Sequence, residues 1–329
     1  MKNLTLNLAL LVAAFAPAAE RQIVVAHRGA SGYLPEHTLE AKAMAHAQGA
    51  DFIEQDVVLT KDDVPVVLHD IHVDTVSDVA QRYPDRVRGD GRFYALDFTL
   101  AELRTLCFTE RFNHKTGKPV YPKRFPLWKG DFRIATLEED LELIAGLNHS
   151  TGRTAGVYPE IKQPKWHRDQ GHDISSIVLP ILRKHGYATK NDLCWVQCFE
   201  WAEVQRIRNE LKWEGRLLQL LGNGKAKDGT DHDYFKTAEG IKHAAQVVDG
   251  MGPEIGAILK PDGSVTDFVA VAHQNKLQVH PYTLRVDQLP KGYDNVQAAM
   301  NALFGKAQVD GLFSDFPDVA VRYLDRASH

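Results

Sequence analysis

The chain has 329 residues, of which 25% are charged and 44% hydrophobic, and its formal net charge is -4. This is the composition of an ordinary globular protein and excludes a disordered or fibrous chain. Nothing in the slightly acidic balance suggests a nucleic-acid partner. The length exceeds one average domain but fits a single large α/β barrel with insertions.

The first segment, residues 1–19, has the layout of a secretory signal peptide. Lys2 precedes an unbroken run of apolar and small residues, and small residues at 16–19 provide an A-x-A-like cleavage site. A membrane anchor is the weaker alternative, because the apolar run is shorter than the roughly 20 residues that a spanning helix needs. We therefore expect an exported protein whose mature part is residues 20–329, without stable membrane insertion.

Short β-rich runs alternate with amphipathic helical patterns along the mature part. Strands are expected at 23–27, 51–59, 65–70, 156–162, 193–199, 216–222, 246–252, 277–284 and 310–316. Helices are expected at 37–48, after the Thr99 and Thr136 capping boxes, and at 173–186, 200–211, 233–245, 264–275, 295–304 and 317–326. About eight repeated strand–helix units predict an α/β fold, a TIM (β/α)8 barrel with parallel strands. An open doubly wound sheet is the alternative.

Residues 71–133 interrupt this alternation after the second strand region. They are rich in charged residues, Tyr, Phe and Pro, and contain one clear short helix pattern. A structureless loop of this length is improbable inside a compact domain, so we expect a small inserted subdomain. An insertion at the carboxyl end of a barrel strand lies beside the active-site face, where we expect it to help define the substrate pocket.

Acidic residues gather where the expected strands end. Glu54 and Asp56 are two residues apart, so they share one face of their strand at about 6.6 Å along it. Glu160 and Lys162 share a face in the same way. Converging carboxylates repel one another unless a positive charge lies between them, and a hard divalent cation with oxygen ligands is the simplest one. Glu54, Asp56 and Glu160 therefore predict a cation site.

Two histidines end neighbouring runs, His27 in IVVAHRG and His69 in PVVLHD. Two imidazoles beside a cation can divide the work of general acid and general base. Arg28 and Lys162 add fixed positive charge, and a guanidinium fork suits a phosphate group. The combination predicts an anionic phosphorus substrate whose transition-state charge is met by metal, Arg and Lys.

Each of these signals has an ordinary alternative. A single Glu-x-Asp in a strand is more often a solvated face, and a lone His more often caps a turn. The glycines at 29 and 32 fit a sharp turn as well as a phosphate loop, and no nucleotide-binding pattern follows them. The joint occurrence of the signals at successive strand ends favours the functional interpretation.

Six segments, in order and spacing, carry a resemblance to a known family: HRGASGYLPEHT, GADFIEQDVVLTKDDVPVVLHD, YPEIK, VQCF, VHPYTLR and DGLFSDFPD. Together they closely resemble the glycerophosphodiester phosphodiesterase family, in particular its periplasmic bacterial enzymes, over nearly the whole mature chain. The resemblance implies a TIM barrel that hydrolyses deacylated phospholipids such as glycerophosphocholine to glycerol 3-phosphate and an alcohol. It also implies a periplasmic location and a divalent cation, usually Ca²⁺, with Mg²⁺ as the alternative.

The resemblance also implies roles for individual residues. It makes Glu54, Asp56 and Glu160 metal ligands, and His27 and His69 the acid/base pair. It places Arg28 and Lys162 on the phosphate. Further expected substrate-binding residues are Gln197 and Phe199, which share a strand face, and Tyr282, which would pack against glycerol or serve only as rim packing. His37 departs from the Asn that many family members carry, and we expect it to cap the first helix, with a contact to the site left open.

Two routes remain open for the reaction. The glycerol 2-hydroxyl, deprotonated by one histidine, could attack phosphorus to give a cyclic phosphate that water then opens, and this route is favoured. Alternatively, metal-bound water could attack directly. Other functions to be distinguished are a sphingomyelinase-like phosphodiesterase on a related barrel and a non-catalytic glycerophosphodiester-binding protein. The partner expected is the small-molecule substrate; a homodimer is left open.

Overall fold

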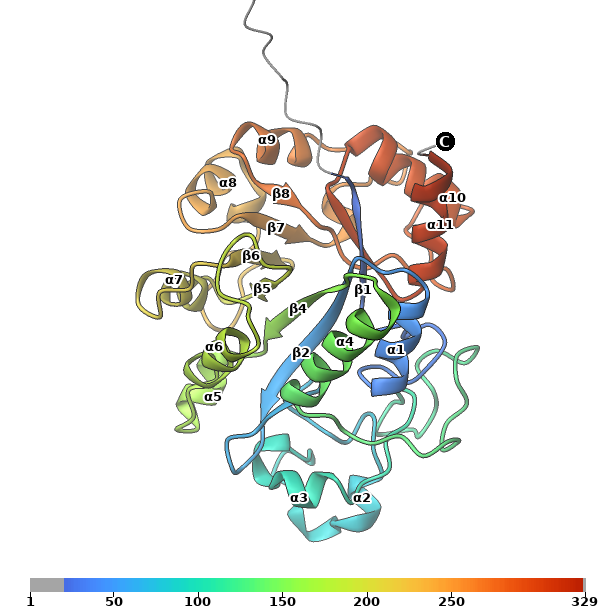
Figure 1. Cartoon of the computed structure of the whole chain (residues 1–329), viewed down its shortest axis with the longest axis vertical. Helices are drawn as coiled ribbons and strands as arrows, with labels where there is room; N and C mark the ends of the chain where they lie inside the picture. Colours follow the sequence, from blue (N-terminus) through green and yellow to red (C-terminus); the bar gives the residue numbers. More distant parts are fainter. Residues whose placement is uncertain (1–20, 328–329) are drawn as a thin grey trace, which may run out of the picture.

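The computed structural model describes residues 21–327, so the expected signal peptide, residues 1–19, lies outside the described residues. Within them, eight parallel strands form a nearly closed barrel with helices outside it (Figure 1). The strands are β1 (Ile23–Ala26), β2 (Phe52–Leu59), β4 (Gly156–Ile161), β5 (Trp195–Cys198), β6 (Arg216–Leu221), β7 (Gly250–Pro253), β8 (Gln278–Val279) and β9 (Gly311–Ser314). The predicted TIM barrel is confirmed.

The strands follow the sheet order β8-β7-β6-β5-β4-β2-β1-β9. The two ends of this order, β8 and β9, are also joined: the Asp310 amide donates to the Val279 carbonyl at 3.0 Å and the Phe313 amide to the Pro281 carbonyl at 3.0 Å. The carboxyl ends of all eight strands therefore point to one face. In barrels of this kind that face carries the active site.

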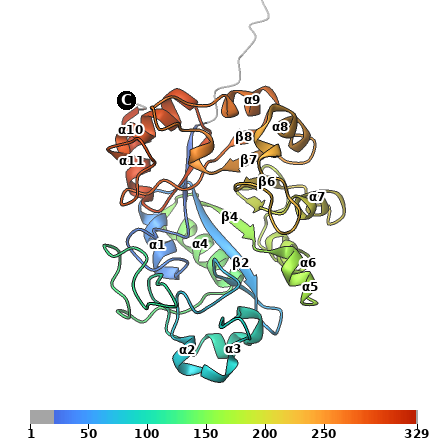
Figure 2. The ribbon, with the colours of Figure 1, turned by 180° about the vertical axis from the view of Figure 1, so that it is seen from behind.

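The helices surround the barrel, and Figure 2 shows the same ring from behind. They are α1 (Leu39–Ala47), α4 (Leu137–Thr151), α5 (Pro164–Asp169), α6 (Ile174–Lys184), α7 (Trp201–Asn209), α8 (Ala238–Ala244), α9 (Phe268–Gln274), α10 (Val296–Met300) and α11 (Pro317–Ala327). A π-helical stretch, Asn301–Ala307, continues α10. Among residues 21–327, no helix combines the length and the apolar character needed to cross a membrane.

The start of α1 differs from the prediction. The Thr38 hydroxyl, rather than a His37 group, accepts the hydrogen bond from the Ala41 amide and caps the helix. His37 adopts a left-handed backbone conformation with a φ of 63°, which turns its side chain away from the helix end. The expectation that His37 caps α1 was therefore wrong, and its ring instead contacts the site described below.

The short strand β3 (Pro65–Val67) corrects a second expectation. It pairs antiparallel with β2, through Val57↔Val67 and Leu59↔Pro65, so it is not one of the parallel barrel strands. Only five residues, 60–64, join the two strands, whereas a parallel crossover needs a dozen or more. The chain thus doubles back, and the Leu68 amide donates to the Asp56 carbonyl at 2.8 Å. His69, two residues after the end of β3, is thereby brought to the site.

Residues 71–133 lie between β3 and α4 and pack around a hydrophobic cluster separate from the barrel core. They contain α2 (Val79–Arg82), α3 (Leu100–Leu103) and short 3-10 turns at Pro84–Arg86 and Ala95–Asp97. In Figure 1 they form the cyan and teal part beside the barrel. The Thr99 and Thr136 capping boxes are both formed, as predicted.

The barrel interior is filled below the site by aromatic and aliphatic side chains. Tyr158 lies at the centre of this cluster, stacked at 6.0 Å on Trp195 and edge-on to Phe313 at 5.0 Å. The buried Tyr158 hydroxyl is hydrogen-bonded to His280 Nδ1 at 2.8 Å. The polar groups above this apolar floor are therefore confined to the carboxyl-terminal face.

Candidate active site

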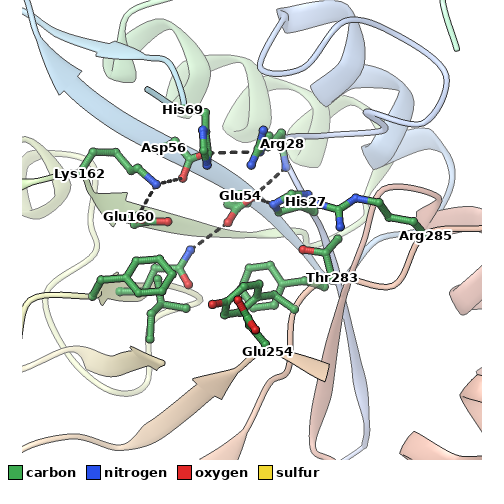
Figure 3. A pocket seen from close by; sticks show the side chains of 15 residues that line it. His27, Arg28, Glu54, Asp56, His69, Glu160, Lys162, Glu254, Thr283 and Arg285 are labelled. Carbon is green, nitrogen blue, oxygen red and sulfur yellow. Dashed lines mark hydrogen bonds and ion pairs between the residues drawn. The ribbon is translucent and has the colours of Figure 1, made fainter. Parts of the chain in front are cut away.

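A cavity of about 380 Å³ opens at the carboxyl ends of the strands (Figure 3). All ten site residues expected from the sequence line it: His27, Arg28, Glu54, Asp56, His69, Glu160, Lys162, Gln197, Phe199 and Tyr282. The other five lining residues are Leu220, Glu254, Thr283, Arg285 and Phe313. None of the fifteen belongs to residues 71–133. The expectation that this segment helps to line the cavity was therefore wrong.

Three acidic residues converge on one side of the cavity. Glu54 and Asp56 point inward from β2, and Glu160 comes from the directly paired position of β4, opposite Asp56. One carboxylate oxygen of each residue lies within 4.8 Å of the other two, and all three side chains are buried. This is the spacing that the alternation of strand side chains predicts.

The charges around these acids are only partly balanced. Burial and the neighbouring Asp56 raise the pKa of Glu54 well above its ordinary value. Burial also raises the pKa of Glu160, to about 8, although Lys162 opposes the shift at 2.7 Å. For Asp56, burial is outweighed by Lys162 and His37, which hold its pKa well below the ordinary value.

The residues present fit a hard divalent cation. Among the described residues, the buried Oδ1 atom of Asp56 has no hydrogen-bond partner. Its nearest ion-pair contact is Lys162 Nζ at 3.7 Å. An all-oxygen set of three carboxylates with an unused lone pair is the donor chemistry that Ca²⁺ and Mg²⁺ prefer. Glu54, Asp56 and Glu160 could therefore hold such an ion.

The two histidines are arranged alike. His27 Nδ1 lies 2.5 Å from Asp315 Oδ1, and His69 Nδ1 lies 2.7 Å from Asp70 Oδ1. A carboxylate on Nδ1 holds the proton there and leaves Nε2 as the nitrogen available for chemistry. Burial and the neighbouring Arg28 lower the pKa of each histidine to about 4. Both rings are therefore neutral near pH 7 in this structure.

The turn after β1 places Arg28 over the acids. Its backbone has a φ of 58°, and its amide donates to Glu54 Oε2 at 2.8 Å while its guanidinium donates to Glu36 Oε2 at 3.0 Å. Gly29 follows with a φ of 83°, and a Cβ there would lie 2.8 Å from the Ala41 backbone. The His-Arg-Gly order is thus explained by a turn that only glycine can complete.

Of the remaining expected residues, Gln197 contacts the acids, whereas Phe199 and Tyr282 form part of the cavity wall. The Gln197 amide donates to Glu54 Oε1 at 3.0 Å, so it orients one acid of the three-acid cluster. Phe199 and Tyr282 meet edge-to-face at 5.8 Å and form an apolar wall. The Tyr282 hydroxyl is bonded to the Leu221 carbonyl at 2.9 Å, which fixes the ring at the rim.

Several residues at the site were not singled out from the sequence. Asp315, which holds His27, follows β9, and Glu254 follows β7, so the strand-end rule used for the other acids would have found both. Arg285 donates to Asp315 at 2.9 Å and lines the cavity with Thr283. For His37, the contact to the site that the sequence left open is present: it lies behind the acids, with Nε2 2.7 Å from Asp56 Oδ2.

Comparison with known proteins agrees with this geometry. Residues 27–319 match the model of the glycerophosphoryl diester phosphodiesterase family. The chain is similar to a glycerophosphodiester phosphodiesterase of Haemophilus influenzae, with 44% identity over 92% of this chain and 90% of that protein. It is 36% identical to one of Treponema pallidum, over 94% of this chain and 93% of the relative.

A solved structure shares the fold. It is that of an Oleispira antarctica phosphodiesterase in complex with the product sn-glycerol-3-phosphate. The TM-score is 0.63 and the sequence identity 18%, over 92% of this chain and 96% of the other. With the family match spanning most of the chain, the conclusion is direct: this protein is an enzyme of the glycerophosphoryl diester phosphodiesterase family.

Proposed function

We propose that the enzyme hydrolyses glycerophosphodiesters, such as glycerophosphocholine, to glycerol 3-phosphate and an alcohol. The observation that carries the proposal is the pairing of two carboxylate-held histidines, His27 and His69, with a buried three-acid cluster in one cavity. The names of the related bacterial enzymes and the product bound to the Oleispira antarctica protein support the substrate class.

A divalent cation on Glu54, Asp56 and Glu160 completes the proposed site. When bound, it would neutralise phosphate charge and favour attack at phosphorus. Ca²⁺ is the preferred ion because the ligands are all oxygens and the protein is expected to be exported, with Mg²⁺ as the alternative. Arg28 and Lys162 flank the same acids and would bind the remaining phosphate oxygens, Arg28 through its planar fork.

His27 and His69 would divide the proton transfers. In the favoured route, one Nε2 takes the proton of the glycerol 2-hydroxyl as its oxygen bonds to phosphorus. The other histidine supplies a proton to the alcohol oxygen as its bond to phosphorus breaks. Water then opens the cyclic phosphate. Phe199 and Tyr282 would pack against the glycerol carbons, in a cavity whose volume suits a small molecule.

The location and boundaries of the mature protein belong to the same proposal. We propose that residues 1–19 are removed on export and that the enzyme acts in the periplasm, where deacylated phospholipids would reach it. The signal-like pattern of these residues is the support. Residues 71–133 would form a subdomain inserted in the barrel, which their separate hydrophobic cluster supports.

A substrate panel tests the reaction class. The mature protein is incubated with glycerophosphocholine or with sphingomyelin, and the products are quantified. Release of glycerol 3-phosphate from glycerophosphocholine, measured with a dehydrogenase-coupled assay, is the expected result. Release of phosphorylated products from sphingomyelin alone would replace the proposal with a sphingomyelinase-like activity. Tight binding of glycerophosphocholine without turnover would instead indicate a binding protein.

A further inference from the structure

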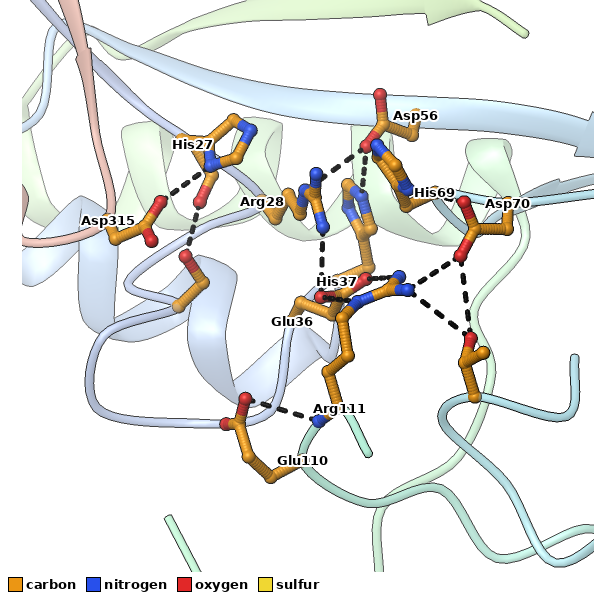
Figure 4. Close-up of polar contacts among 12 residues, drawn as sticks. His27, Arg28, Glu36, His37, Asp56, His69, Asp70, Glu110, Arg111 and Asp315 are labelled. Carbon is orange, nitrogen blue, oxygen red and sulfur yellow. Dashed lines mark hydrogen bonds and ion pairs between the residues drawn. The ribbon is translucent and has the colours of Figure 1, made fainter. Parts of the chain in front are cut away.

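An arginine of the 71–133 segment joins two groups of the active site from behind (Figure 4). Arg111 binds Glu36 with two hydrogen bonds, at 2.6 and 2.8 Å, and binds Asp70 at 2.6 Å. Glu36 holds the guanidinium of Arg28, and Asp70 holds Nδ1 of His69. A single buried guanidinium therefore connects the phosphate-binding arginine to one of the two histidines.

A second arginine of the same segment, Arg124, contacts the carboxylate that holds the other histidine, His27. Arg124 donates to Asp315 Oδ2 at 2.6 Å, and the other oxygen of Asp315 holds His27 Nδ1. Arg124 is also anchored by Asp287, through bonds at 2.8 and 3.0 Å. Its side chain is only 4% exposed. Asp315 has one further cationic partner, Arg285, at 2.9 Å.

These bonds are of the kind that fix side-chain geometry. Both contacts join an ionised donor to an ionised acceptor, and Arg111 engages Glu36 in a two-bond fork, so each arginine restricts the carboxylate it holds. Metal-ligating and catalytic histidines depend in general on the partner of their second nitrogen for orientation. Neither arginine lines the substrate cavity, so their effect on the reaction must pass through the carboxylates.

We propose that the 71–133 segment orients both reactive histidines, Arg111 acting on His69 and Arg124 acting on His27. Both arginines are positioning residues rather than catalytic ones. The inference rests on the proposed function in so far as the two histidines are its acid/base pair. The segment thereby contributes to turnover without touching the substrate.

Asp70 and Asp315 differ in how many cationic side chains hold them. Among the described residues, Arg111 is the only arginine or lysine that bonds to Asp70, whereas Asp315 retains Arg285 when Arg124 is removed. Arg111→Gln should therefore lower kcat by about 100-fold and raise KM as well, because Glu36, which holds Arg28, is no longer fixed by Arg111. Arg124→Gln should lower kcat by about 10-fold with KM unchanged.

The first test measures kcat, KM and Ca²⁺ affinity of Arg111→Gln, Arg111→Lys and Arg124→Gln. We expect Ca²⁺ affinity to stay within about twofold of wild type, since neither arginine contacts the three acids directly. Added guanidinium ion, below denaturing concentration, should restore part of the kcat of Arg111→Gln. The matched control is Arg88→Gln, which breaks a two-bond pair with Asp97 in the same segment and removes no hydrogen bond to Asp70 or Asp315.

The second test does not depend on turnover. Nitrogen–proton correlation spectra of the histidine rings, assigned with His27→Gln and His69→Gln, should show the His69 signals displaced by Arg111→Gln and the His27 signals displaced by Arg124→Gln. Ring signals unchanged in both variants, or an equal loss of kcat in Arg88→Gln, would overturn the inference. A wild-type enzyme inactive on glycerophosphocholine would overturn the proposed function. The ring signals would still show whether Arg111 and Arg124 orient the two histidines.

Discussion

His37 Nε2 lies 2.7 Å from Asp56 Oδ2, behind the three-acid cluster. Its other ring nitrogen lies 3.3 Å from the ammonium of Lys42, which can only donate. The proton of the ring must therefore sit on Nε2 and point at Asp56. Burial, with Lys42 beside the ring, lowers the pKa of His37 to about 3 and keeps it neutral. His37 is thus built to orient Asp56.

Replacing His37 with Phe should weaken cation binding. The variant removes the donor to Asp56 while keeping a ring of similar shape, and loss of such a partner typically costs about 10–100-fold in metal affinity. Calcium titration by calorimetry measures the Ca²⁺ affinity. His46→Phe is the control, because His46 is a buried histidine of α1 that bonds to Asn148 instead. Equal Ca²⁺ affinity in His37→Phe and wild type would contradict this role.

Replacing Glu160 with Gln should lower cation affinity and activity together. The variant removes one of three ligand charges, and the affinity of an oxygen-ligand site depends on its charge count, so we expect a loss of about 100-fold. Calcium titration and glycerol 3-phosphate release are measured on the same preparation. A variant that keeps its Ca²⁺ affinity would remove Glu160 from the ligand set.

Replacing His27 with Ala should lower activity while leaving cation affinity unchanged. The ring is held by Asp315 and approaches Glu54 only to 3.8 Å, so the three acids keep their own contacts. We expect kcat to fall by about 10²–10⁴-fold, as for loss of a general acid or base, with Ca²⁺ still bound. Loss of the ion in the calorimeter would show that His27 belongs to the cation site instead.

A substrate without the glycerol 2-hydroxyl distinguishes the two routes of attack. The favoured route uses that hydroxyl as the nucleophile, so the 2-deoxy analogue of glycerophosphocholine should bind as a competitive inhibitor and release no alcohol. Choline release is the measurement, with unmodified substrate as the control. Turnover of the analogue would point to direct attack by water.

Glu110 predicts a pH-dependent loss of stability. It is 2% exposed, and its Oε2 atom has no hydrogen-bond partner among the described residues. Burial and the nearby Glu36 raise its pKa from 4.5 to about 8. Between these two values the folded protein retains a proton that the unfolded chain has lost, so this group's contribution to stability falls as pH rises through the window.

Replacing Glu110 with Gln should remove this pH dependence. Relative to wild type, the variant should gain about 3–4 kcal/mol in free energy of unfolding on going from pH 5 to pH 8. Urea unfolding at both pH values measures the difference. Glu239→Gln, at an exposed position of α8, is the control. A pH-independent difference between Glu110→Gln and wild type would show that Glu110 is ionised in the fold.

The parts of this molecule that follow local rules were predictable from the sequence. The barrel follows from repeated strand–helix units, and the convergence of Glu54, Asp56 and Glu160 follows from side-chain alternation on two neighbouring strands. Both capping boxes depend on residues three positions apart. Their outcome is therefore set by short segments of chain.

The parts that depend on distant segments were not predictable. The contact between Arg111 and Glu36 joins residues 75 positions apart, and the contact between Arg124 and Asp315 spans 191. No periodicity in the sequence encodes such pairings. The direction of β3 was mistaken because an apolar run does not show whether its partner is parallel. The role of His37 as a helix cap was wrongly predicted because its left-handed backbone, which no sequence pattern indicates, redirects the ring.

The most direct test of cation-dependent hydrolysis follows glycerophosphocholine by phosphorus NMR with the mature protein, in Ca²⁺, in Mg²⁺ and after chelation. We expect the substrate signal to be replaced by that of glycerol 3-phosphate with one cation present, through a transient cyclic phosphate. Turnover should stop on chelation and return when Ca²⁺ is restored. Hydrolysis that continues unchanged after complete chelation would contradict a cation site at Glu54, Asp56 and Glu160.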